Sequence, residues 1–184
     1  TTTVPLLGVV LSVTVKISLS KFSSLVNKFP LTGIFINVLL ISVNANIQLD
    51  KIITLTEEMG LSDIVDFYGR VSDEVLLEVL NTADVCVNPD KPTEMNNLST
   101  MNKIMEYMAL AKPIVQFDLT EGRFSAQEAS LYARRNDVED LADKILQLLD
   151  DPSMRRSMGD FGHSRVINEL EWKYEEPKLL EVYR

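Results

Sequence analysis

The segment Ser99–Ala111 combines hydroxyl, amide, ammonium and carboxylate groups with an apolar stripe. Met101, Ile104, Met105 and Met108 follow the i, i+3, i+4, i+7 pattern, which predicts a helix with these side chains buried. Pro113, two positions after Ala111, ends the helix. The chemistry of the segment therefore depends on the polar residues that fall outside the stripe.

Those polar residues suit an anion with a neighbouring diol. Free N–H groups and the dipole at a helix start favour an anion such as a diphosphate, to which Ser99 and Thr100 would add hydroxyl donors. Asn102, Lys103 and Glu106 share a face of the helix, and Lys103 adds a cation. The Glu106 carboxylate accepts hydrogen bonds only, which suits a ribose 2′,3′-diol. Spacing alone also allows a simple N-cap at Ser99 or Thr100 and a solvated Lys103–Glu106 pair.

Alternating short apolar segments and helices would position this helix. Strands are expected at Ile64–Tyr68, Asp84–Asn88, Ile114–Phe117 and Leu131–Ala133. Helices are expected at Asp50–Met59, after Ser72, at Ser99–Ala111, Asn136–Leu149, Ser153–Leu170 and Trp172–Arg184. This order predicts an α/β fold, a Rossmann-like parallel sheet flanked by helices. Ligands of such sheets bind beyond the carboxyl ends of the strands, which here are followed by Gly69–Val71, Asn88–Thr100 and the turn after Phe117.

Several residues mark the ends of these elements. Gly60 is expected as a C′ glycine and Ser72 as an N-cap. Asn136 opens a segment with the spacing of a capping box. The terminal helix 172–184 is expected to dock through four apolar side chains, those of Trp172, Leu179, Leu180 and Tyr183. The N-terminal third is interpreted as strand Leu6–Val10, helix Ser18–Phe29 and strand Ile34–Ile41.

Composition limits the class of protein. The 184 residues allow one sizeable domain, and the net charge of -9 argues against a nucleic-acid partner. A single cysteine, Cys86, excludes an internal disulfide and fits a cytoplasmic location. The apolar stretches Val4–Val15 and Ile34–Ile41 are too short to span a membrane. Membrane association is left open.

The segment Asn102–Val115, Asn-Lys-Ile-Met-Glu-Tyr-Met-Ala-Leu-Ala-Lys-Pro-Ile-Val, resembles the donor-site helix of family 4 glycosyltransferases (glycosyl transferases group 1). The usual form is Lys-x-x-Glu-Tyr-Met-Ala followed by Gly-Lys-Pro-Val-Val. Gly69-Arg70-Val71, the segment Ala83–Pro89 and the helix Asn136–Leu149 are also similar to this family. The resemblance covers roughly 61–183, and it implies the C-terminal donor-binding lobe of the two-lobed GT-B fold.

The resemblance implies a role for each matching residue. The lobe would bind a nucleoside diphosphate sugar for glycosyl transfer with retention of configuration, in glycan biosynthesis. Amides at the start of the helix would hold the diphosphate, and Glu106 the ribose. Arg70 and Val71 would lie beside the base. No cofactor or bound metal is expected, because protein donors would stabilise the leaving diphosphate.

Three departures from the family pattern limit this implication. The family often has a sugar-contacting glutamate where this chain has Leu98, so Asn96 or Asn97 would have to supply polar contacts. Residues 1–49 fit the spacing of the fold but lack a glycine-rich or basic loop, having Leu11–Thr14 at the first such place and Ser42–Ala45 at the second. The acceptor-binding lobe, expected as a partner, has no room in the chain. We therefore expect the chain alone to bind nucleotide without transferring sugar.

Two other classes of protein share features of this sequence. A non-catalytic nucleotide-binding or scaffold module derived from the same fold is the alternative. A phosphoacceptor receiver domain needs an acidic pair after its first strand, and residues 1–49 contain no acid. Outside the helix, we expect Cys86 to be buried and His163 to lie on the surface. Arg123 occupies a cleft position after the strand Ile114–Phe117, where it would meet phosphate or the acceptor, or else be an exposed loop arginine.

Overall fold

A computed structural model of the chain describes residues 11–18, 35–42, 49–63, 65–69 and 71–183. These residues belong to two compact units, Thr1–Ala83 and Asp84–Arg184, which we describe separately. The expected single domain over 1–184 stays a prediction. The expected strand Leu6–Val10, nearly all of the helix Ser18–Phe29, and Arg70 lie outside the described residues.

Among the described residues of the N-terminal unit, three strands pair in antiparallel fashion. Strand β1 (Leu11–Ser18) pairs with β2 (Phe35–Ser42), and on its other side with β3 (Val65–Gly69). The expected parallel pairing is therefore wrong for this unit. The place where the family has a phosphate loop, 11–14, is part of β1 instead. An apolar, β-branched run predicts a strand, but the direction of its neighbour depends on pairing across the fold.

In the described part of this unit, two helices accompany the strands, and their ends follow local signals. Helix α2 (Leu49–Glu58) is followed by Gly60, whose φ of 66° confirms the expected C′ glycine. Helix α3 (Asp73–Thr82) begins at the N-cap Ser72, whose side chain accepts from the Val75 amide at 3.5 Å. Asp73 and Glu74 lie in the first turn of α3, where carboxylates favour the positive end of the helix dipole.

The C-terminal unit is built on the expected parallel sheet. Strand β5 (Ile114–Phe117) lies between β4 (Val85–Asn88) and β6 (Ser130–Ala133), and both pairings are parallel. Every side chain of β4 and β5 is buried, which is typical of strands covered on both faces. The pairing Asn88↔Gln116 and Phe117↔Ala133 brings the carboxyl ends of the strands to one edge.

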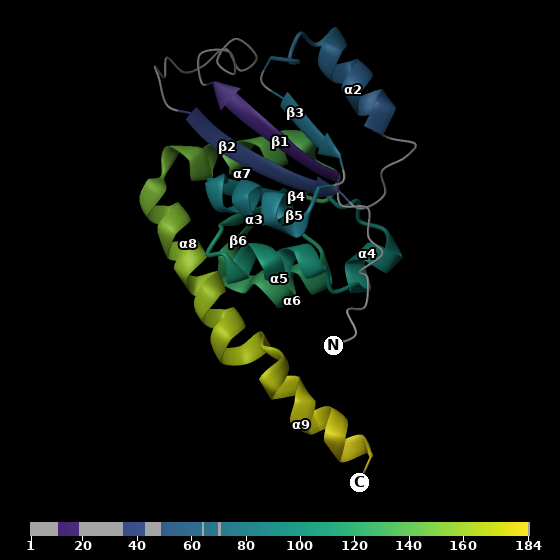
Figure 1. The fold of residues 1–184 in the computed structure, drawn as a ribbon, viewed down its shortest axis with the longest axis vertical. Coiled ribbons are helices and arrows are strands. Elements are labelled where there is room, and N and C mark those ends of the chain that lie inside the picture. Colours follow the sequence, from purple (N-terminus) through teal and green to yellow (C-terminus); the bar gives the residue numbers. More distant parts are fainter. Residues whose placement is uncertain (1–10, 19–34, 43–48, 64, 70, 184) are drawn as a thin grey trace. The chain divides into compact units, whose positions relative to one another are not determined.

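Helices and short turns connect and cover these strands. They are α4 (Glu94–Leu98), α5 (Asn102–Ala109), α6 (Thr120–Ala126), the 3-10 turn η1 (Gln127–Ala129), α7 (Val138–Asp150), α8 (Pro152–Arg165), the π-helical turn η2 (Val166–Leu170) and α9 (Trp172–Val182). Helix α7 contacts all three strands, whereas α5 packs against α6 and α8 (Figure 1). The N-cap of α7 is Asp137, one residue after the expected Asn136, because Asn136 takes a left-handed φ of 60°.

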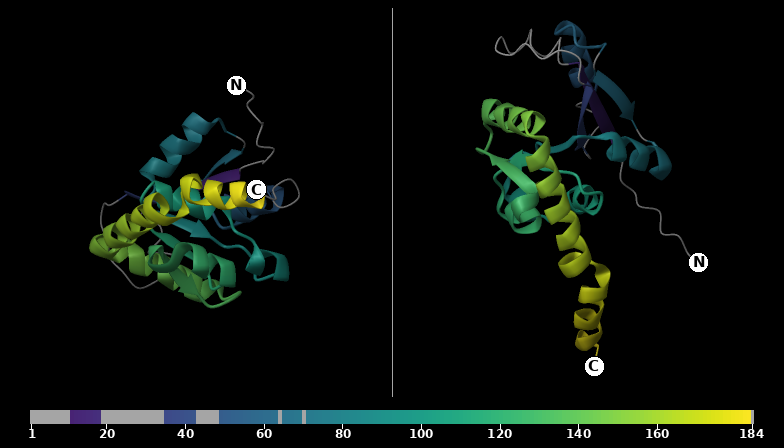
Figure 2. Two further views of the ribbon diagram at one scale, coloured as in Figure 1. Left: turned by 90° about the horizontal axis from the view of Figure 1, so that it is seen from below. Right: turned by 90° about the vertical axis from the view of Figure 1, so that its left-hand side faces the viewer.

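The terminal helix α9 is present, but its apolar side chains are exposed. Trp172, Leu179, Leu180 and Tyr183 expose 64%, 46%, 50% and 81% of their surface. In Figure 1 and in the right-hand view of Figure 2, α9 extends beyond α8 and away from β4, β5 and β6. The described residues therefore do not supply the surface on which we expect this helix to dock.

Candidate functional site

The candidate site lies at the carboxyl edge of the parallel sheet, by which we mean residues 89–103, 118–121 and 134–137. These segments follow β4, β5 and β6 respectively. They contain five of the predicted site residues, namely Asn97, Ser99, Thr100, Asn102 and Lys103, and Glu106 follows one turn into α5. The edge is therefore where the sequence placed it, but several of its contacts differ from those expected.

The helix that carries Glu106 begins later than predicted. Residues 94–98 form the separate short helix α4, which Thr93 caps by accepting from the Asn96 amide at 3.1 Å. Ser99 and Met101 have extended backbone angles, so α5 begins at Asn102. The N-cap of α5 is Met101, which provides no side-chain cap. Ser99 and Thr100 therefore precede this helix instead of opening it.

The hydroxyl groups of Ser99 and Thr100 already donate hydrogen bonds within the protein. Ser99 Oγ donates to the Met95 carbonyl at 2.6 Å, and Thr100 Oγ1 donates to Glu121 Oε1 at 2.7 Å. A hydroxyl has one proton to donate. Either residue would have to give up its present partner to donate to an anion.

Lys103 is buried and paired with a carboxylate. Its Nζ lies 2.8 Å from Asp90 Oδ2, and the two side chains expose only 7% and 23% of their surface. This burial rules out the fully solvated Lys103–Glu106 pair that spacing allowed. The charge of Lys103 is thus balanced inside the protein, which weakens its expected role as a free cation for the diphosphate.

Asn102 and Glu106 lie on the exposed side of α5, but Lys103, expected on the same face, is buried. The buried side is turned relative to the expected stripe, because Lys103 and Tyr107 are buried with Ile104 and Met108. Tyr107 is fully buried and was missed as a core residue. The Glu106 carboxylate is therefore accessible to a ligand at this edge.

Asn97 holds three segments of the carboxyl edge together. Its Oδ1 accepts from the Thr120 amide at 3.0 Å, from Thr120 Oγ1 at 3.1 Å and from Arg135 Nη2 at 3.2 Å. Thr120 begins α6, and Arg135 follows β6. The side-chain oxygen of this predicted ligand residue thus has a structural role.

Arg135 is the residue at this edge that the sequence analysis missed. Besides the bond to Asn97, its Nε donates to the Asp118 main-chain carbonyl at 2.6 Å. A signal was available, since Arg134 and Arg135 directly follow the strand ending at Ala133. The rule that selected the segments after β4 and β5 applies equally to the segment after β6.

Arg123 lies on α6 and contacts Asp118 at the carboxyl edge. Its Nε pairs with Asp118 Oδ1 at 2.8 Å, and its guanidinium lies 4.1 Å from the centre of the Tyr132 ring. The hydrogen bond from Arg123 is the main cause that lowers the pKa of Asp118, and the charge of Arg135 adds to it. Burial raises the pKa of Tyr132 to about 12. Arg123 therefore has a carboxylate partner at the cleft position predicted for it.

The remaining predicted residues lie elsewhere. Val71 is half-buried in the N-terminal unit, directly before the cap of α3. Cys86 is buried as expected, and burial raises the pKa of its thiol. His163 is exposed as expected, with Nδ1 2.8 Å from the Ala109 carbonyl. In the described part of the chain, no three His, Cys, Asp or Glu side chains gather as metal ligands would, and the expectation of metal-free chemistry stays a prediction.

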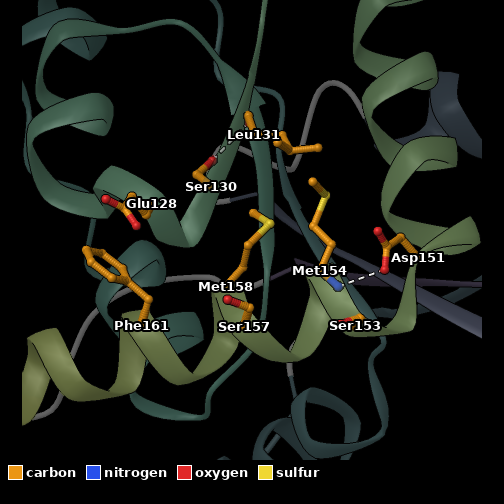
Figure 3. Close-up of a pocket in the computed structure, with 9 residues that line it drawn as sticks. All are labelled: Glu128, Ser130, Leu131, Asp151, Ser153, Met154, Ser157, Met158 and Phe161. Carbon is orange, nitrogen blue, oxygen red and sulfur yellow. Dashed lines mark hydrogen bonds between the residues drawn. The ribbon is translucent and has the colours of Figure 1, made fainter.

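A pocket of about 570 Å³ lies away from the carboxyl edge, between η1, β6 and α8 (Figure 3). Its lining residues are Glu128, Ser130, Leu131, Asp151, Ser153, Met154, Ser157, Met158 and Phe161. Ser130 begins β6, so the pocket is at the amino end of that strand. Asp151 uses Oδ1 to accept from the Met154 amide at 2.8 Å, which caps α8.

Comparisons with known proteins agree on one family. Residues 22–151 match the sequence profile of glycosyl transferases group 1. The chain is 31% identical, over 70% of its length, to the MMP α-(1→4)-mannosyltransferase of Mycolicibacterium hassiacum, of which it covers 31%. It resembles the structure of sucrose-phosphate synthase from Thermosynechococcus elongatus with a TM-score of 0.64 and 25% identity, covering 80% of this chain and 37% of that one.

Both relatives are much longer than this chain. It spans about a third of the length of each. Within the described residues, every helix is too short or too polar to cross a bilayer. The profile match extends over well more than half of the chain, and the structural match adds a Rossmann-like α/β fold of the GT-B type. The chain therefore belongs to the glycosyl transferases group 1 family.

Proposed function

We propose that the C-terminal unit binds a nucleoside diphosphate sugar, as the donor-binding part of a retaining glycosyltransferase. The observation that carries the proposal is the position of Glu106, exposed one turn into α5 at the carboxyl edge of a parallel sheet. Ligands of such sheets bind at this edge. A carboxylate there accepts hydrogen bonds from a vicinal diol such as that of a ribose.

The proposed roles of the other residues follow their contacts. Asn102 is exposed at the first turn of α5, where a side-chain amide and main-chain N–H groups would meet the diphosphate. Lys103 would lie buried beneath this site, and its charge is balanced by Asp90. Arg70 and Val71 belong to the N-terminal unit, and their role beside the base stays a prediction.

Binding of nucleotides tests the proposal. We expect UDP or GDP at millimolar concentration to raise the melting temperature of the protein, and Glu106→Ala to weaken that nucleotide's affinity at least about tenfold, because charge-assisted hydrogen bonds are lost. Asp143→Ala is a matched control, since Asp143 is an exposed carboxylate on α7, and it should leave the affinity unchanged. Absence of a shift with any nucleoside diphosphate would refute the proposal.

The alternative is a module that binds nucleotide without catalysis. Leu98, at the position of the family's sugar-contacting glutamate, exposes 68% of its surface at this edge and offers no hydrogen bond from its side chain. Hydrolysis or transfer of a UDP- or GDP-sugar by a protein that also contains the acceptor lobe would favour the enzyme. Tight binding of nucleotide without turnover in that protein would favour the module.

A further inference from the structure

Three basic side chains near the carboxyl edge are paired with carboxylates. The pairs are Lys103–Asp90 at 2.8 Å, Arg123–Asp118 at 2.8 Å and Arg134–Asp137 at 2.9 Å. An ion pair within the protein offsets the charge that an anionic ligand would otherwise meet. These three cations are therefore poor candidates for the main positive charge of an anion site.

Arg135 differs from them because the groups that accept its hydrogen bonds are neutral. Among the described residues it forms no ion pair, and its two hydrogen-bond acceptors are neutral: the Asp118 carbonyl at 2.6 Å and Asn97 Oδ1 at 3.2 Å. Its side chain is nevertheless exposed. Lys91 is also exposed at this edge, but no hydrogen bond within the described part of the chain fixes its ammonium group.

A guanidinium that is held by hydrogen bonds and has no ion-pair partner among the described residues favours a particular class of ligand. Of the five N–H donors of arginine, Arg135 uses two in these bonds, so three remain for a ligand. The planar fork matches two oxygens of a phosphate, and a side chain that is already ordered loses less entropy on binding. Arg135 has an acidic neighbour, since its charge helps to lower the pKa of Asp118, but its hydrogen bonds go to neutral acceptors.

We propose that Arg135 binds a phosphoryl group of the ligand, with Asn97 as its positioning residue. This inference rests on the proposed function for the location of the ligand. It replaces Lys103 with Arg135 as the main cation of the site. The phosphoryl group would come either from the diphosphate of the donor or from a phosphorylated acceptor, since both present the same oxygens to a guanidinium.

Inorganic pyrophosphate is the direct probe. By titration calorimetry at low ionic strength, we expect Arg135→Gln to weaken its binding about tenfold, because a bidentate charge-assisted contact is lost. Arg134→Gln is the matched control, since Arg134 is the adjacent exposed arginine but is paired with Asp137, and it should bind within about twofold of the unmodified protein. Equal losses in both variants, or no loss in Arg135→Gln, would overturn the proposal.

A second measurement uses the unmodified protein, so it needs no folded variant. Phenylglyoxal modifies accessible arginines, and mass spectrometry of proteolytic peptides separates Arg134 from Arg135. We expect pyrophosphate to slow modification of Arg135 in the unmodified protein and to leave the rate at Arg134 unchanged. A purely structural role for Arg135 predicts no protection, and that result would contradict the proposal.

Further ligands distinguish the two sources and the two proposals. Dependence of UDP or GDP affinity on Arg135 would assign the donor diphosphate, whereas dependence of glycerol 3-phosphate affinity alone would assign an acceptor phosphate. If UDP binding depends on Glu106 and no phosphate ligand depends on Arg135, the proposed function stands and this inference fails. If pyrophosphate binding depends on Arg135 but UDP and GDP bind no better than pyrophosphate, the inference stands and the nucleotide site fails.

Discussion

The two edges of the parallel sheet in the C-terminal unit differ in their contacts: one is closely packed, and the other is joined by polar side chains. At the amino edge, α8 packs against the end of α5 so closely that a Cβ built on Gly159 would lie 2.1 Å from the Ala111 carbonyl oxygen. At the carboxyl edge, polar side chains link segments far apart in the sequence, such as Asn97 and Arg135 at 3.2 Å. The amino edge therefore maintains the fold, whereas the carboxyl edge presents exposed polar groups to a ligand.

This comparison predicts which substitutions change stability and which change binding. Changes at the amino edge should lower or raise the free energy of unfolding and leave ligand affinity intact in the folded protein. Changes of exposed residues at the carboxyl edge, such as Glu106 and Arg135, should do the opposite. The following substitutions test the amino edge, in order of decreasing expected effect.

Gly159→Ala should have the largest effect. The added methyl group meets main-chain atoms of Ala111, which cannot move without displacing the end of α5. We expect the free energy of unfolding, measured by urea denaturation, to fall by about 3 kcal/mol. Asp160→Ala, at the next and exposed position of α8, should change it by less than about 0.5 kcal/mol. Similar values for the two variants would show that the close approach is not needed.

Ala111→Gly should have a smaller effect of opposite sign. Ala111 follows α5 with a φ of 53°, a left-handed conformation that disfavours a Cβ. The usual family motif has glycine here. We expect a gain of about 1 kcal/mol in the free energy of unfolding, reduced by the greater freedom of glycine in the unfolded chain. The matched variant Ala109→Gly, within the last turn of α5, should instead lose about 1 kcal/mol. A loss in both would mean that the conformation at Ala111 carries no strain.

Ser157→Phe should have the smallest effect, and it tests the pocket in Figure 3. Ser157 is an exposed residue of α8 that lines the pocket, so a phenyl ring there would fill part of its volume. If the carboxyl edge binds the ligand, the affinity for UDP or GDP should stay within about twofold, because distant sites act independently. A tenfold loss of affinity would transfer the nucleotide site to the pocket and reverse the comparison of the two edges.

The sequence predicted those features that depend on neighbouring residues. Strand β5 was predicted with its observed bounds, and the Ser72 cap and the C′ glycine at Gly60 were confirmed. Each depends on a short pattern: an apolar run before a turn, a hydroxyl before an acidic first turn, or a residue without Cβ after a helix. The position of the candidate site at the carboxyl edge followed from the order of strands and helices.

Only the tertiary structure decided which side chains are available at that edge. The pair Lys103–Asp90 and the contact Asn97–Arg135 join residues that no periodic pattern relates. The start of α5 at Asn102 depends on the separate helix α4, and the antiparallel direction of β1 depends on pairing with β2 and β3. Helices and caps form from local hydrogen bonds, whereas charge balance and strand direction result from packing between distant segments. For this reason the sequence could place Glu106 and Arg135 after strands, but only the fold showed which contacts hold Arg135.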